Sequence, residues 1–163
     1  MLDDMNHDEA LRTHLQTLLD WQDAHVGFDA AIEGIPPELR GVKPAGLPYS
    51  LWQALEHLRI CQWDILDFCR NPDYQEMMPE EYWPKTIEPP APDAWERSVG
   101  DFRRDREMLK QLAADPALDL FAAIPHGNGQ TYLRELLLVS DHNAYHIADL
   151  IAVRRLLGIW ISS

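Results

Sequence analysis

The sequence predicts an all-α protein, an antiparallel four-helix bundle with long crossover loops. Four long segments carry apolar residues at steps of three and four, which is the spacing of one buried helix face. Connections rich in proline and glycine separate these segments, and no segment shows convincing strand patterning. With 163 residues the chain has the size of one ordinary domain, so we expect a single domain over 1–163.

The first predicted helix covers residues 6–33. Its apolar stripe runs through Leu15, Trp21 at its edge, His25 and Phe28, and the glycine and prolines of 34–37 are expected to end it. The stripe predicts that His25 faces the interior of the bundle.

The second predicted helix begins after Tyr49 and ends near Arg70, because the Asn-Pro pair that follows cannot continue it. Ser50 is its expected N-cap, and Gln53 is placed to complete a capping box. The connection over 73–92 holds too many prolines for a helix, and its aromatic residues predict that it lies against the bundle.

The third helix is predicted over 93–114 with Asp93 as its cap, and the fourth over 131–157 with Thr131 as its cap. Between them, the glycine-rich tip at 126–129 resembles a hairpin turn, which leaves room for a short pair of strands.

The charge and composition of the chain exclude some classes of partner and location. A net charge of −13 without a basic stripe argues against nucleic acid and against anionic membrane surfaces as partners. No apolar run is long enough for a bilayer, and the acidic N-terminus does not resemble a secretory signal, so we expect a cytoplasmic protein. Cys61 and Cys69 would lie roughly 12 Å apart on one helix, too far for a disulfide, and are expected to be apolar packing residues.

The strongest chemical signal is the pair His142 and His146 in the fourth predicted helix. Histidines four residues apart lie on one helix face, one turn apart, and can converge on one ion. The helix is largely apolar after them, so at least one imidazole should face the core, where it needs partners for its nitrogens. Such a partner is either a metal ion or a hydrogen-bonding group inside the core.

His57 lies on the expected inward face of the second helix. By itself it is more typical of a core histidine bonded to a backbone carbonyl than of a ligand. Together with His142 and His146 it would make three ligands from two helices, which leaves coordination positions open, as in a catalytic metal site.

The segments 47–59 and 140–146 resemble the DinB-like superfamily of metal-dependent four-helix bundles, whose known members include bacillithiol- and mycothiol-dependent S-transferases. The resemblance covers nearly the whole chain. It implies an antiparallel bundle with crossover loops, and a metal held by His57, His142 and His146. It implies an activity less firmly, because relatives include thiol transferases, isomerases and hydrolases.

Other residues are candidates for the surroundings of this site. Asp149 shares a helix side with His142 and His146 and is expected to bind the second nitrogen of a ligand histidine. Tyr49, Trp52 and Trp83 are expected to wall the pocket. His25 is a candidate catalytic or pocket residue, with a core histidine as the alternative.

We therefore expect a metal-dependent enzyme that acts on a small molecule, by thiol S-transfer or by hydrolysis. The expected cofactor is one divalent ion, zinc or nickel, with a low-molecular-weight thiol as a candidate co-substrate, and the bundle is of a kind that forms homodimers. The alternatives are a protein that binds or senses a metal or small ligand without turnover, and a bundle that the metal only staples.

Overall fold

The computed structural model describes residues 6–20 and 24–160. Within these ranges the chain is helical, and its only β feature is a single antiparallel bridge between Ala123 and Thr131. The all-α prediction is therefore confirmed, and no pair of strands forms at 126–129. The α-helices are α1 (His7–Leu19), α2 (Phe28–Ile32), α3 (Leu51–Arg70), α4 (Ala94–Ala114) and α5 (Tyr132–Leu156), and the 3-10 helices are η1 (Pro37–Leu39) and η2 (Pro79–Glu81).

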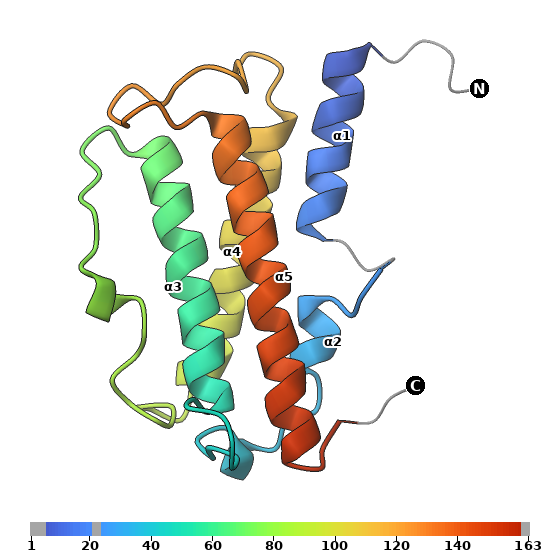
Figure 1. Ribbon diagram of the computed structural model, residues 1–163, viewed down its shortest axis with the longest axis vertical. Helices are drawn as coiled ribbons and strands as arrows, with labels where there is room; N and C mark the ends of the chain where they lie inside the picture. The colour runs from blue at the N-terminus through green and yellow to red at the C-terminus, as the bar shows by residue number, and fades with distance from the viewer. Residues whose placement is uncertain (1–5, 21–23, 161–163) are drawn as a thin grey trace.

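The helices form a bundle of four columns, with α1 and α2 together making one of them (Figure 1). α3 packs against both α4 and α5, while α1 packs mainly on α4 and α2 on α5. α3 runs antiparallel to α5 but parallel to α4, so the connection from 71 to 93 returns along the length of the bundle (Figure 1). This connection is the long crossover that the sequence predicts.

None of the helices in the described part of the chain is long and apolar enough to cross a membrane.

The first helix differs from its prediction as one element over 6–33. α1 ends at Leu19 with Asp20 as its C-cap, and α2 begins only at Phe28, with Gly27 in extended conformation as its N-cap. Glycine is a poor residue for a helix interior but is accepted at an N-cap, which favours a break at this point. His25 consequently lies in a connection rather than on a helix face, and Trp21 is outside the described residues.

The caps of the other helices mostly follow the sequence. Ser50 and Gln53 form the predicted capping box of α3, and Thr131 accepts a hydrogen bond from the Arg134 amide at the start of α5. Asp93 precedes α4 but makes no side-chain cap; its carboxylate pairs with Arg97 instead.

The buried apolar residues form two clusters along the bundle. One joins α2 to α3, α4 and α5 around Phe28, Leu55 and Phe102, and the other joins α1 to the same helices around Leu15 and Leu109. Cys61 and Cys69 are buried and unbridged, as predicted.

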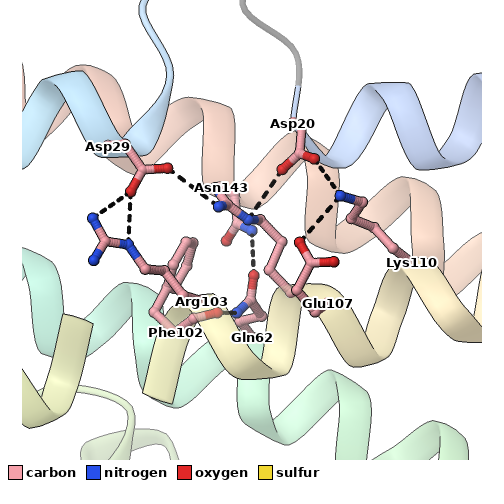
Figure 2. A network of polar contacts seen from close by, with 9 residues as sticks. Asp20, Asp29, Gln62, Phe102, Arg103, Glu107, Lys110 and Asn143 are labelled. Carbon is pink, nitrogen blue, oxygen red and sulfur yellow. Dashed lines mark hydrogen bonds and ion pairs between the residues drawn. The ribbon is translucent and has the colours of Figure 1, made fainter. Parts of the chain in front are cut away.

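A polar layer joins the helices near the middle of the bundle (Figure 2). The Gln62 amide donates to the Phe102 carbonyl at 2.7 Å and accepts from the Asn143 amide at 2.9 Å, which links α3, α4 and α5. Arg106 of α4 pairs with both Asp20 and Asp29, so one guanidinium joins the end of α1 to the start of α2.

Candidate metal centre

Three imidazoles from two helices meet on one side of the bundle. His57 comes from α3, and His142 and His146 come from successive turns of α5. The Nε2 atom of His57 lies 3.1 Å from Nε2 of His146 and 3.3 Å from Nε2 of His142. The structure thus brings together the three histidines that the resemblance implies.

Hydrogen bonds at Nδ1 of His57 and of His146 fix which nitrogen faces inward in each of these two rings. His57 Nδ1 lies 2.7 Å from the Tyr82 carbonyl oxygen, which can only accept, so this nitrogen carries the proton. His146 Nδ1 lies 2.8 Å from Asp149 Oδ2, and the same reasoning places a proton there in the neutral ring. Both Nε2 atoms then present lone pairs to each other.

This arrangement fits a metal ion. Two nitrogen lone pairs 3.1 Å apart with no proton between them repel each other, and a cation placed between them removes that repulsion. Two nitrogen ligands at about 2.0–2.1 Å from a tetrahedral zinc ion would themselves be about 3.3–3.4 Å apart. The observed separations of 3.1 and 3.3 Å are close to that value.

Burial keeps two of the three imidazoles in the form that binds metal. Desolvation, together with the neighbouring His146 and His57, lowers the pKa of His142 to about 4. Desolvation also lowers the pKa of His57, against the opposing effect of its hydrogen bond to Tyr82. Both rings are therefore neutral at pH 7, when a ring nitrogen is free to ligate.

Aromatic side chains cover part of this cluster. Trp83 stacks on His57 with ring centroids 4.0 Å apart and planes 7° from parallel, and Tyr49 stacks on Trp83 in turn. Tyr145, 70% exposed, lies edge-on to His146. Burial and the Asp149 carboxylate raise the pKa of Tyr49, so its hydroxyl keeps its proton at neutral pH.

Two residues expected at this site lie elsewhere. Trp52 is only 3% exposed, belongs to the apolar core, and donates its indole N–H to Thr86 at 2.9 Å. His25 is exposed and lines a separate cavity of about 50 Å³ beside Asn143, a lining that includes none of the three clustered histidines.

Three residues near the cluster were missed or assigned another role by sequence reasoning. The Tyr82 carbonyl has no sequence signal, because every residue carries one. Asp64 accepts hydrogen bonds from the hydroxyls of Tyr74 and Tyr82, both at 2.9 Å, and so holds the connection that presents this carbonyl to His57. Cys61, expected only to pack, has its sulfur 3.5 Å from His57 Nδ1; its position four residues after His57 was a usable signal.

The comparisons with known proteins agree with the fold and with a metal site. The sequence model of the DinB superfamily matches residues 20–150, which is most of the chain and includes all three histidines. No curated protein and no solved structure gives a significant match. With a match of this extent, the chain belongs to the DinB superfamily.

Proposed function

We propose that this protein binds one divalent metal ion through Nε2 of His57, His142 and His146, and that it uses the ion to catalyse a reaction of a small molecule. The convergence of three Nε2 atoms, two of them with Nδ1 held by a hydrogen-bond acceptor, carries the proposal. Membership of a superfamily of metal-dependent proteins supports it.

The choice of ion follows from the donors. Neutral imidazole suits zinc and nickel, whereas magnesium and calcium prefer oxygen ligands. We therefore propose zinc or nickel as the resident ion.

The proposed reaction is thiol S-transfer or hydrolysis. Three histidine ligands leave a position open, and the chemistry supplied there is Lewis acidity, which lowers the pKa of a thiol or water. A low-molecular-weight thiol is thus the proposed co-substrate for S-transfer.

The chain's own groups would orient and shield the site. Asp149 and the Tyr82 carbonyl hold the rings of His146 and His57 in the orientation that points Nε2 inward. Trp83 covers one face of His57 and restricts access of water from that side. Exposed Tyr145 is the proposed contact for a substrate that enters beside His146.

The test measures metal content and turnover in the same preparations. Elemental analysis of the purified full chain should find about one ion per chain, and His142→Ala and His146→Ala should lose it. His14→Ala, which removes an exposed histidine of α1, is the matched control and should keep the ion. Turnover is then assayed with a panel of electrophiles plus thiols, and with esters and amides.

The outcomes separate the candidate functions. A chain that neither retains nor takes up zinc or nickel overturns the metal site. A chain that binds the ion in a histidine-dependent way but shows no turnover across the panel favours the alternative, a protein that binds or senses a metal or ligand.

A further inference from the structure

We propose that a cleft at one end of the bundle binds a small organic molecule that carries a primary ammonium group. The cleft lies between the C-terminal half of α3, the first part of the crossover and the loop that leads into α5, and Figure 1 shows these segments meeting at one end of the bundle. Its volume is about 510 Å³, which is the size of a small-molecule site. Its described lining includes none of the three clustered histidines, so the proposal does not depend on the metal ion.

The buried carboxylate of Glu135 carries the proposal. Glu135 lies in the first turn of α5, lines the cleft and is 2% exposed. Within residues 6–20 and 24–160 its side chain has one hydrogen bond, which Arg134 donates to Oε1 at 2.6 Å, and Oε2 has none. The side chain of Arg134 is 56% exposed, so most of its charge is solvated. A buried carboxylate with this one partner is poorly compensated, and a cation in the cleft would stabilise it.

Asp64 supplies a second buried carboxylate from the α3 side of the cleft. It accepts hydrogen bonds from the hydroxyls of Tyr74 and Tyr82, yet burial still raises its pKa, so the two hydroxyls do not fully offset its desolvation. Glu76 adds an exposed carboxylate to the same wall. The one arginine among the described lining residues is Arg134, which is already paired. The charges of the wall therefore favour a cation over an anion.

Aromatic rings form the part of the wall that would contact the rest of the ligand. Phe68 meets Tyr74 and His126 edge to face, with ring centroids 5.1 and 5.3 Å apart. An added Cβ at Gly127 would lie 2.9 Å from the Phe68 ring, so glycine permits the close approach of this loop. Aromatic rings contact apolar groups and also attract ammonium groups to their faces.

The acceptors of the cleft select a cation with N–H donors. His126 Nε2 lies 2.8 Å from the Phe68 carbonyl oxygen and so carries a proton, which leaves Nδ1 as an acceptor in the neutral ring. Glu135 Oε2 and the Asp64 carboxylate are acceptors from the other two sides. A primary ammonium group has three donors for such a set, whereas a quaternary ammonium has none, and a hydrated metal ion would leave the aromatic wall without an apolar partner.

The experiment titrates the full-length protein with 2-phenylethylammonium and follows the backbone amides by ¹H–¹⁵N NMR. We expect saturable shifts at amides of the cleft, such as those of Asp64, Gly127 and Glu135. Two analogues of the same body, 2-phenylethanol and trimethyl(2-phenylethyl)ammonium, should bind at least about tenfold more weakly, because neither gives the carboxylates a charged N–H donor. Nα-acetyl-lysinamide tests the other source of this group, the lysine side chain of a partner protein, and should also bind more weakly.

Two variants and a control assign the binding to the cleft. Glu135→Gln and Asp64→Asn should each weaken 2-phenylethylammonium binding by at least about tenfold. Glu9→Gln makes the same chemical change at an exposed position of α1, away from the cleft, and should leave the affinity unchanged. Circular dichroism and the dispersion of the amide spectrum check that each variant is folded, and a variant that fails this check leaves the other as the test.

Three results would overturn the proposal. The first is 2-phenylethylammonium binding that is no tighter than that of 2-phenylethanol, or that is unchanged in the folded variants. The second is a set of shifts spread over the surface that disappears at 150 mM salt, which would reflect only the net charge of −13. The third is tighter binding of Nα-acetyl-lysinamide, which would assign the cleft to a lysine of a partner protein. None of these results bears on the three-histidine site.

Discussion

At the scale of single residues, the contact between Asp149 and His146 decides which imidazole nitrogen is available to an ion. Asp149→Ala removes the acceptor from His146 Nδ1 and leaves the ring free to turn or to change tautomer. We expect metal affinity to fall about 10- to 100-fold, measured by competition with a chromophoric chelator. Asp141→Ala, which removes an exposed carboxylate from the same helix, should leave the affinity unchanged. Equal losses in the two variants would point to a general charge effect instead.

Asp105 gives a pH prediction away from the metal site. This α4 carboxyl is 2% exposed, and desolvation raises its pKa despite the opposing Arg104 ion pair. The folded state therefore holds the proton more tightly than the unfolded chain, whose pKa is near 3.8. Stability contributed by this group is present below that pH and is lost as the pH rises through the folded pKa.

The test is to compare Asp105→Asn with wild type by urea unfolding between pH 4 and 7. The free energy of unfolding of the variant relative to wild type should increase as the pH rises, because Asn cannot ionise. A pH-independent difference at position 105 would contradict the raised pKa.

The predictable part of the site is the part that lies on one helix. The spacing of His142, His146 and Asp149 places them on one side of α5, and the structure has the Asp149–His146 contact. The approach of His57 depends on how α3 packs against α5, so the residues alone favoured a core histidine over a ligand. The Tyr82 carbonyl could not be predicted, because it depends on the path of a proline-rich connection.

At the scale of helices, hydrogen bonds from Arg12 connect α1 to the C-terminal end of α4. Its guanidinium donates to the carbonyl oxygens of Ala113, Asp115 and Leu118, at 3.2, 2.6 and 2.8 Å. These carbonyls lie at and beyond the C-terminus of α4, where helix carbonyls lack partners within the helix.

Arg12→Leu should lower the free energy of unfolding by about 2–4 kcal/mol, because it leaves three acceptors unpaired at a partly buried position. Arg97→Leu removes an exposed arginine of α4 and should change stability by no more than about 0.5 kcal/mol. Urea denaturation followed by circular dichroism gives both values. If Arg12→Leu lowers the free energy of unfolding by no more than Arg97→Leu does, water must replace the hydrogen bonds that Arg12 makes to the three carbonyls.

The break between α1 and α2 marks a limit of pattern reading at this scale. The three- and four-residue spacing continues across the break, since Leu15 and Phe28 both face the core. Such an apolar spacing indicates which residues are buried, but it does not show that they belong to one continuous helix. Gly27, at the N-cap of α2, was the local signal of the boundary.

At the scale of the whole molecule, the two apolar clusters should hold the fold without a metal ion. They bury many large side chains, each worth about 1.5–3 kcal/mol, whereas small zinc domains lack such a core. Metal-free protein should remain helical and melt cooperatively. A free ion concentration of 100 times the dissociation constant adds about 2.7 kcal/mol to the free energy of unfolding, which raises the Tm by roughly 5–10 °C.

Circular dichroism with thermal melting of chelator-treated protein measures both effects, and His146→Ala should resemble metal-free wild type. Loss of most helical signal at 25 °C after metal removal would instead assign the ion the role of a structural staple.

The parallel course of α3 and α4 gives the crossover from 71 to 93 a thermodynamic role. The chain must travel back along the bundle, and on that path it supplies the carbonyl of Tyr82 and the ring of Trp83 to His57. Docking of the crossover and occupancy of the histidine cluster are therefore linked equilibria, and linkage is reciprocal. If undocking of the crossover lowers the metal affinity by a given factor, then bound metal must disfavour undocking by the same factor. Amide hydrogen exchange in this segment should slow by that factor when the ion is bound.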